Sequence, residues 1–248
     1  MQELNRLKIC TNFILNNSDR GEYLSDRFSV DSRRINNNQI FISLESNVAK
    51  NITNINHAIT KGASGFITPF CISRQKIRTS LPFLIEKDIN KIYVDLFKAD
   101  FEDKEPKPVI IGITGTNGKT TTVSLSHDLV LKMGYKSGLI STNTIKINNE
   151  EYEASLTTPD SYDTNLYLRK MVDLEIDFCF MEVSSHSIDQ ERINSLEFFL
   201  CVFTNITHDH LIYHGDFKSY LNTKKRLFDR LKKNQKSLVN IDDKNGIY

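Results

Sequence analysis

Hydrophobic and polar residues alternate along the first hundred positions in a way that predicts a small α/β domain. Apolar residues recur at helical spacing near residues 2–16 and again over residues 51–61. Short runs rich in β-branched and aromatic residues stand between and after these stretches. The expected strands are Arg27–Val30, Gln39–Leu44, Gly65–Thr68 and Phe83–Glu86. Short strands that alternate with helices are typical of an α/β domain.

A polar segment at residues 101–108 separates this region from the rest of the chain. It contains two of the five prolines among mostly charged residues, and it gives way abruptly to the apolar run Val109–Ile113. Proline and charge between two patterned regions are typical of a linker. We therefore predict two domains, residues 1–106 and residues 107–248.

The second region alternates regularly between strand-like and helix-like segments. The expected strands are Val109–Thr114, Lys136–Ile140, Phe178–Val183, Phe198–Phe203 and Ser237–Ile241. The expected helices are Thr120–Met133, Ser161–Val172 and Asp216–Lys233, and a hairpin-like stretch extends to Glu153. This order predicts a mostly parallel sheet with helices on both faces. Because no closing helix follows the last strand, we expect this second α/β domain to be incomplete.

Composition excludes several classes of protein. Hydrophobic residues make up 39% of the 248 residues and charged residues 25%, which is a globular composition. No apolar run approaches the roughly 18 residues of a membrane span, and the N-terminus lacks the features of a secretory signal. The net charge of +1 gives no reason to expect a nucleic-acid partner. The cysteines are widely spaced: Cys10, Cys71, Cys179 and Cys201. We expect a soluble cytoplasmic protein with reduced thiols.

The strongest chemical signal is the sequence TGTNGKT at Thr114–Thr120, between an expected buried strand and a helix. Glycines let backbone N–H groups surround phosphate oxygens, and a helix N-terminus favours negative charge. Lys119 would meet the β- and γ-phosphates of a nucleotide, and the Thr120 hydroxyl would bind Mg²⁺. The strict Walker pattern needs glycine at Ile113. The alternative is a glycine turn with an incidental lysine.

Polar groups follow the next expected strands. Glu182 stands at the end of an apolar run, where an open parallel sheet presents its ligands, and can reach a metal at the phosphate loop. Ser184, Gln190 and Arg192 could contact an anionic substrate. Lys224 lies between apolar positions of an amphipathic helix and could be drawn inward.

Four of the six histidines fall between His186 and His214. The spacing of His208, His210 and His214 could indicate zinc. No cysteine lies nearby in sequence, and a nucleotide loop already requires Mg²⁺. We therefore favour a histidine that assists a magnesium site, and zinc stays the alternative.

The motifs taken together resemble the Mur ligase family, the ATP-dependent enzymes that extend the peptide stem of the bacterial cell-wall precursor. They are TGTNGKT, Thr157-Thr158-Pro159, Glu182-Val-Ser-Ser-His186, Asn205, Asp209-His210 and Tyr213-His214-Gly215. The first domain is similar to the family's domain that binds uridine diphosphate (UDP). The segments that carry this similarity are Asp31-Ser32-Arg33, Gln39–Ile42 and Gly62-Ala63. The resemblance extends over nearly the whole chain.

The resemblance implies a role for each candidate residue. ATP would contact Gly115, Thr116, Asn117, Gly118, Lys119, Thr120, Thr121 and, toward the base, Asn205. The UDP group would contact Ser32, Asn47, Val48 and Ala49. The muramoyl peptide would contact Thr157, Thr158, Ser184, Gln190 and Arg192. Magnesium would be held by Thr120, Glu182, His210 and Lys224, the lysine being carbamylated by CO₂. The catalytic set would be Lys119, Glu182, His210 and Lys224.

The implied activity is that of a cytoplasmic ligase which uses ATP and Mg²⁺ to add the third amino acid to UDP-N-acetylmuramoyl-L-alanyl-D-glutamate. The γ-phosphoryl group of ATP would pass to the D-glutamyl carboxylate, and the amine of the incoming amino acid would then displace phosphate. The partners would be the UDP-muramoyl dipeptide and the amino acid, without nucleic acid or membrane insertion.

The sequence also departs from the family pattern. Leu156 and Ile212 replace an asparagine and an aspartate, and Asn38 and Ser46 stand at usual glycine positions. We expect the chain to lack the C-terminal domain that recognises the amino acid in this family. One alternative is therefore a non-catalytic remnant that binds UDP-muramoyl peptide or nucleotide. Another is a ligase similar to folylpolyglutamate synthetase, although the Ser-Ser-His and Tyr-His-Gly segments count against it.

Overall fold

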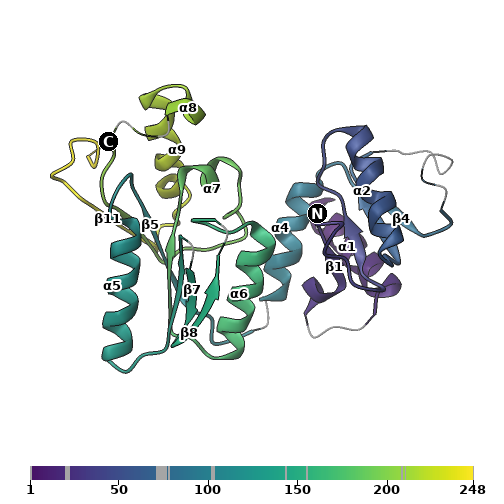
Figure 1. The fold of residues 1–248 in the computed structure, drawn as a ribbon, viewed down its shortest axis with the longest axis horizontal. Coiled ribbons are helices and arrows are strands. Elements are labelled where there is room, and N and C mark those ends of the chain that lie inside the picture. The colour runs from purple at the N-terminus through teal and green to yellow at the C-terminus, as the bar shows by residue number, and fades with distance from the viewer. Residues whose placement is uncertain are drawn as a thin grey trace. The chain divides into compact units, whose positions relative to one another are not determined.

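A computed structural model shows two compact units, Met1–Asp103 and Lys104–Tyr248, each with its own sheet (Figure 1). The structure describes residues 2–19, 23–70, 77, 79–101, 104–142, 144–154, 156–207, 209 and 211–247. The break between the units lies within the polar segment at residues 101–108.

The first unit contains a four-stranded parallel sheet in the order β1-β2-β3-β4. Its strands are β1 Phe28–Ser29, β2 Ile40–Ile42, β3 Gly65–Thr68 and β4 Phe83–Ile85. Its helices are α1 Gln2–Asn17, a 3₁₀ turn η1 Leu24–Arg27, α2 Val48–Thr60 and α4 Ile89–Asp100. Phe41 and Phe66 on neighbouring strands pack with Ile55 and Ala58 of α2 in one buried cluster. The α/β architecture expected for this region is confirmed.

Helix α4 was not among the expected elements, although its sequence carries a clear helical signal. Its buried apolar side chains recur at positions i, i+3, i+4, i+7 and i+8. They are Ile89, Ile92, Tyr93, Leu96 and Phe97. The Tyr93 and Phe97 rings meet edge to face, with 4.8 Å between centroids, and both contact the Phe28 ring. This apolar face packs against α1, η1 and the Phe28 ring of β1, which stabilises the helix.

A buried polar network joins the ends of β2 and β3 to α2. The Asn51 side-chain amide donates to Ser43 Oγ at 2.8 Å and to the Glu45 carbonyl at 3.2 Å. The Thr68 hydroxyl donates to Asn51 Oδ1 at 3.1 Å. Ser43, Asn51 and Thr68 are all fully buried, so each depends on the others to satisfy its polar atoms.

The second unit contains a seven-stranded sheet in the order β11-β10-β5-β9-β6-β7-β8. Its strands are β5 Val109–Thr114, β6 Ser137–Ser141, β7 Thr144–Ile147, β8 Glu150–Glu153, β9 Phe178–Glu182, β10 Leu200–Phe203 and β11 Lys236–Val239. All neighbouring strands are parallel except for the β6-β7-β8 meander. The mostly parallel sheet expected from the sequence is confirmed.

Helices lie on both sides of this sheet, and Figure 1 shows α5 and α6 on opposite faces. The helices are α5 Lys119–Lys132, α6 Ser161–Asp173, α7 Ser185–Asp189, α8 Leu211–His214 and α9 Phe217–Asp229. Ile111 and Ile113 of β5 pack with Val123 of α5 and Leu139 of β6. This packing places the β5–α5 loop at the carboxyl edge of a central strand, which is where open α/β sheets bind ligands.

Two differences from the expected elements have local causes. Helix α9 ends at Asp229, four residues earlier than expected, and the next residue, Arg230, donates to the carbonyls of Asn194 and Leu196. The short helices α7 and α8 were not expected at all. In α7 the Ser184 side chain caps the first turn by accepting a hydrogen bond from the Ser187 amide.

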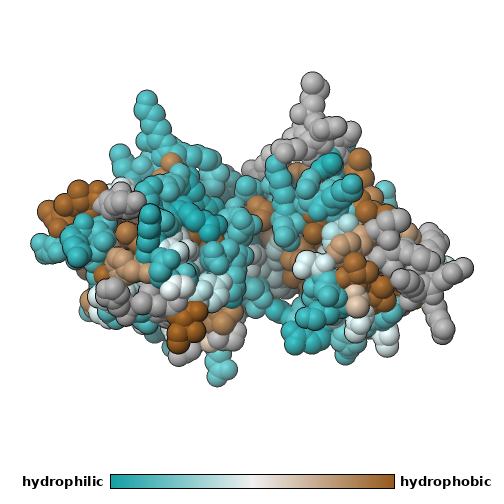
Figure 2. All heavy atoms as spheres, turned by 90° about the horizontal axis from the view of Figure 1, so that it is seen from above, coloured by the Kyte–Doolittle hydropathy of each residue, from teal (hydrophilic) through white to brown (hydrophobic). Residues whose placement is uncertain are grey.

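The surface and the thiols show no sign of a membrane segment or a disulfide in the described ranges. No helix there combines the length and apolar character that crossing a bilayer requires. Figure 2 shows hydrophilic residues over much of the face in view, with hydrophobic residues in separate groups. Cys10, Cys179 and Cys201 are free and buried, and burial raises the pKa of each thiol to about 12. Cys71 lies outside the described residues.

The polar network around Asn51 generates a first prediction. In the variant Asn51→Ala, the Ser43 and Thr68 hydroxyls lose buried partners, which costs about 1–3 kcal/mol. Native-state hydrogen exchange should report this loss of protection at the amides of β2 and β3. The control is Thr53→Ala, an exposed position two residues further along the same helix, with an expected change within about 0.5 kcal/mol. Equal protection in both variants would contradict a structural role for the network.

Candidate functional site

Glycines at two positions shape the loop between β5 and α5. A Cβ atom on Gly115 would lie 1.9 Å from the Thr204 hydroxyl oxygen. A larger residue therefore cannot occupy this position without displacing the segment at Thr204 and Asn205. Gly118 is the N-cap of α5 and has a φ of 83°, in the left-handed region that favours glycine. Ile113, where the strict Walker pattern has glycine, is buried in β5. The close approach occurs two residues later, so glycine is not needed there.

The loop is held from the other side by the residues that follow β10. The Thr116 amide donates to the Asn205 carbonyl at 2.8 Å, and the Asn117 amide donates to Asn205 Oδ1 at 3.0 Å. Asn205 Nδ2 donates back to the Asn117 carbonyl at 3.0 Å, and the Thr204 hydroxyl donates to the same carbonyl at 2.7 Å. Asn205 therefore fixes the shape of the loop. Its contact with an adenine base stays a prediction.

The outer part of the loop is open to solvent. Asn117, Gly118, Thr120 and Thr121 are exposed, and α5 begins at the adjacent Lys119. The amides of the first helical turn and the positive end of the helix dipole therefore face a region that solvent can reach. Such an arrangement is suited to phosphate oxygens.

Lys119 folds back over the loop. Its Nζ donates to the Gly115 and Thr116 carbonyls, both at 2.9 Å. Burial lowers the pKa of the Lys119 amine, and the negative charges of Glu182 and Asp209 oppose this shift. The amine therefore lies against the loop carbonyls. The nearby carboxylates favour its charged form.

Lys224 reaches the same loop from α9. It is 2% exposed, and its Nζ donates to the Gly115 carbonyl at 2.9 Å and lies 3.4 Å from the Thr114 hydroxyl. The amine also lies 4.8 Å from the centre of the Tyr220 ring. Burial, together with repulsion by Lys119, lowers the pKa of Lys224 to about 7. The helical pattern allowed an inward position for Lys224, and the structure shows its side chain buried.

Glu182 is fully buried at the end of β9, beside Ile113 of the neighbouring strand β5. Its Oε1 accepts hydrogen bonds from the Ser141 hydroxyl and from the Thr142 amide, the latter at 3.0 Å. Ser141 and Thr142 were not among the expected site residues. Ser141 ends β6, which pairs with β9, so the rule that ligands gather at carboxyl strand ends could have indicated it.

Four of the five residues expected to hold the muramoyl peptide lie together near the end of β9. The Thr158 hydroxyl donates to the Glu182 carbonyl at 2.8 Å and accepts from the Ser184 amide at 3.1 Å. Arg192 donates to the Thr158 carbonyl at 3.0 Å and to Gln190 Oε1. Thr157, the fifth, precedes Thr158 and is partly exposed. These contacts link the polar residues after β9 to the segment before α6.

The residues expected to hold magnesium are described only in part. His210 lies outside the described residues, as does His208 of the zinc alternative. Among the residues that the structure does describe, no group of three or more His, Cys, Asp or Glu side chains could hold a metal ion. Mg²⁺ commonly binds one or two carboxylates together with nucleotide phosphates and water. The Glu182 carboxylate and the Thr120 hydroxyl are donors of the kind that Mg²⁺ prefers, so the donor set fits without such a group.

The first unit brings its own candidate residues to two places. The Ser32 hydroxyl lies 3.1 Å from His57 Nδ1, a histidine that the sequence interpretation missed. Asn47 caps α2, its side chain accepting from the Lys50 amide at 3.1 Å. Val48 and Ala49 form the exposed first turn of that helix. The helix N-terminus offers amide donors to an anionic group.

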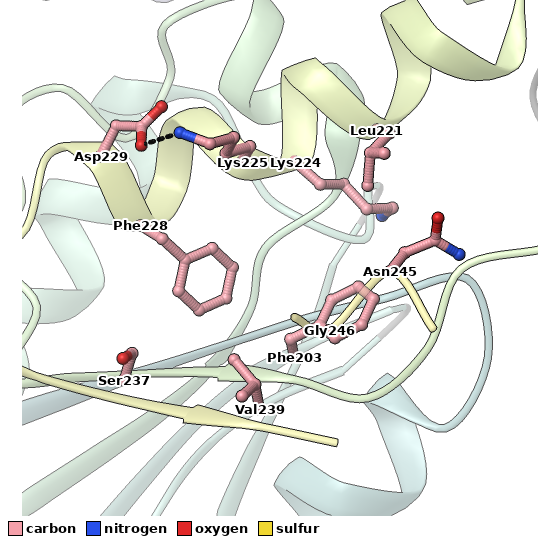
Figure 3. A pocket seen from close by; sticks show the side chains of 10 residues that line it. All are labelled: Phe203, Leu221, Lys224, Lys225, Phe228, Asp229, Ser237, Val239, Asn245 and Gly246. Carbon is pink, nitrogen blue, oxygen red and sulfur yellow. Dashed lines mark hydrogen bonds and ion pairs between the residues drawn. The ribbon is translucent and has the colours of Figure 1, made fainter. Parts of the chain in front are cut away.

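A cavity of about 260 Å³ lies between α9 and the strands β10 and β11 (Figure 3). Phe228 extends from α9 toward Val239 of β11, and Phe203 and Leu221 add further apolar surface. Of the candidate residues that the structure describes, only Lys224 lines this cavity. The exposed loop residues Asn117, Gly118, Thr120 and Thr121 do not line it.

Comparison with known proteins identifies relatives for both units. The family description "Mur ligase middle domain" matches residues 113–247. The chain is 38% identical over 217 residues to UDP-N-acetylmuramoyl-L-alanyl-D-glutamate–2,6-diaminopimelate ligase of Parabacteroides distasonis, covering 88% of this chain and 44% of that protein. It is 39% identical over 220 residues to the ligase of the same name from Phocaeicola vulgatus, covering 88% and 45%. The chain thus spans less than half the length of these relatives.

Solved structures agree with these matches. A structure of a UDP-N-acetylmuramoyl-L-alanyl-D-glutamate–2,6-diaminopimelate ligase superposes with a TM-score of 0.73 at 28% identity, covering 89% of this chain and 44% of that one. The MurF ligase of Thermotoga maritima in complex with ADP shares the fold, with a TM-score of 0.62 at 16% identity over 91% of this chain and 48% of that one. The family match over residues 113–247, supported by relatives that cover both units, shows that the chain belongs to the Mur ligase family.

Proposed function

We propose that this chain binds ATP through its second unit and UDP-N-acetylmuramoyl-L-alanyl-D-glutamate through both units, as the part of a ligase that activates the D-glutamyl carboxylate. The observation that carries the proposal is the convergence of Lys119 and Lys224 on one carbonyl of an exposed phosphate loop, with Glu182 close enough to act on the Lys119 charge. The two relatives above are named for a ligase that uses this muramoyl peptide.

Lys119 would neutralise the phosphate charge that develops during transfer. Its Nζ now donates to two backbone carbonyls of its own loop. Exchange of these neutral acceptors for phosphate oxygens would give charge-assisted hydrogen bonds, which are stronger. Because the lysine is fixed next to the loop before the nucleotide arrives, little reorganisation is needed in the transition state.

Glu182, Thr120 and His210 would hold Mg²⁺, which when bound would neutralise phosphate charge and align the transferred group. The Ser141 and Thr142 donors hold the Glu182 carboxylate in place at the strand end. The Glu182 Oε2 atom accepts a longer hydrogen bond from the Thr142 hydroxyl, at 3.4 Å, and a carboxylate oxygen has further acceptor capacity for a cation.

Arg192, Gln190, Ser184 and Thr158 would orient the muramoyl peptide, and Ser32 with the first turn of α2 would hold its UDP group. Arginine pairs with carboxylates in a fixed bidentate geometry, so Arg192 suits an acidic peptide. Once phosphorylated, the D-glutamyl carboxyl would be attacked by the amine of an amino acid, forming the amide and releasing phosphate. We propose 2,6-diaminopimelate as this amino acid, because the relatives are named for it.

Calorimetry with Mg·ATP tests the nucleotide site. Wild-type chain should release or absorb heat on binding, and Lys119→Met should bind about 10- to 100-fold more weakly, because a hydrogen bond to a charged group contributes about 1.5–3 kcal/mol. Lys132→Met, at the exposed end of the same helix, is the matched control and should bind like wild type. Absence of heat from wild type would eliminate the nucleotide part of the proposal.

The peptide site has a separate test. Arg192→Ala should weaken binding of UDP-muramoyl dipeptide by about 10- to 100-fold, because a charge-assisted pair is removed. Its affinity for Mg·ATP should stay close to that of wild type. Lys232→Ala removes an exposed cation paired with Glu197 and should change neither affinity. Equal dipeptide affinity of Arg192→Ala and wild type would contradict the assigned role.

Carbamylation of Lys224 gives a pH-dependent prediction. The neutral amine adds to CO₂, forming an N–C bond and releasing one proton, so the product should increase as the pH rises through about 7, the lowered pKa of this amine. With ¹³C-labelled bicarbonate, NMR should show a carbamate signal in wild type and in Lys225→Ala, whose lysine is more exposed. The signal should be missing in Lys224→Met. Its persistence in that variant would place the modification elsewhere.

A further inference from the structure

One series of contacts joins the phosphate loop to the turn that follows β9. The Tyr220 hydroxyl of α9 lies 3.2 Å from the Thr116 hydroxyl in the loop. The Tyr220 ring lies against the His214 ring of α8, with 5.1 Å between centroids. His214 Nε2 lies 2.9 Å from the hydroxyl of Ser185, the first residue of α7. Ser184, a candidate peptide contact, is its neighbour in sequence.

The members of this series are held tightly. Tyr220 is fully buried, Ser185 is 2% exposed and Thr116 is 8% exposed. Tyr220 packs with Phe203 and Ile206 in a buried cluster, which fixes the ring and therefore the position of its hydroxyl. A rigid side chain that contacts two elements can transmit a small displacement of one to the other.

Packing of the ring alone does not require a hydroxyl group on residue Tyr220. A phenylalanine ring would fill the same apolar space, whereas a buried tyrosine hydroxyl needs a polar partner. That partner is a hydroxyl of the phosphate loop, which in turn accepts from the Thr207 amide at 3.0 Å. The same ring faces the Lys224 amine at 4.8 Å. Tyr220 thus contacts the loop, the buried lysine and α8 together.

We infer that Tyr220 is a positioning residue that couples the phosphate loop to the Ser184–Ser185 turn, so that nucleotide binding changes the affinity for UDP-muramoyl dipeptide. This inference rests on the proposed function, which assigns ATP to the loop and the peptide to the turn. Coupling of this kind is reciprocal, so the dipeptide must change the nucleotide affinity by the same factor.

The test compares affinities in a cycle. Calorimetry measures the dissociation constant of UDP-muramoyl dipeptide for the full chain with and without a saturating, non-hydrolysable ATP analogue and Mg²⁺. In wild type the two constants should differ by about fivefold or more, the lower end of typical couplings. In Tyr220→Phe, which keeps the ring and loses only the hydroxyl, the ratio should approach one. The thermal unfolding midpoint, measured alongside, should stay close to that of wild type.

Two further variants make the result specific. Ser185→Ala removes the partner of His214 at the other end of the series and should also bring the ratio close to one, which keeps the inference testable if Tyr220→Phe folds poorly. Tyr135→Phe alters a tyrosine that is 46% exposed and packs on Phe178. It should keep the wild-type ratio.

The outcomes separate the inference from the proposed function. Failure of the wild-type chain to bind ATP or the dipeptide would overturn the proposed function, and the coupling with it. Binding of both ligands with a wild-type ratio of one, or with a ratio unchanged in Tyr220→Phe and Ser185→Ala, would overturn the coupling alone. A reduced ratio in both variants, with the Tyr135→Phe ratio unchanged, supports Tyr220 as the connecting residue.

Discussion

The carbonyl oxygen of Gly115 accepts hydrogen bonds from two lysine amines, and the second unit is organised around this point. Lys119 reaches it from α5 and Lys224 from α9, each at 2.9 Å. Removal of both amines from water is costly, and burial lowers the pKa of both. A phosphate anion would relieve that cost for Lys119, whereas the proposed carbamate would replace the buried amine of Lys224. Much of the surrounding structure, from the Asn205 contacts to the buried Glu182, serves to keep this arrangement in place.

The chemical centre could be predicted because its residues are local in sequence. The run from Thr114 to Thr120 carries strand end, glycine turn and helix start together, and the apolar run before Glu182 locates that carboxylate at a strand end. The partners of Glu182 could not be predicted in this way. Ser141 and Thr142 lie about forty residues earlier and reach it only because β6 pairs with β9. No single segment of the sequence specifies the order of the strands in a sheet.

The helices and strands also divide into those that the local sequence predicts and those that depend on tertiary contacts. Strands such as Gly65–Thr68 and Val109–Thr114 begin and end where the apolar pattern predicts. The helix at Ile89–Asp100 has apolar residues at helical spacing, although it was not among the expected elements. The helices of four and five residues are different, because isolated helices of that length are not stable and tertiary contacts decide whether they form. His214, the last residue of α8, makes such a tertiary contact, because its Nε2 lies 2.9 Å from the Ser185 hydroxyl.

Strand β11 has a consequence for handling the protein. It lies at one edge of the seven-stranded sheet, and all four of its residues are exposed, including Leu238 at 58%. An edge strand with apolar side chains offers a template on which a strand of another molecule can add. Lys236 at its start is the kind of charge that opposes such addition. This edge therefore favours self-association at high protein concentration, and salt that screens the Lys236 charge should promote it.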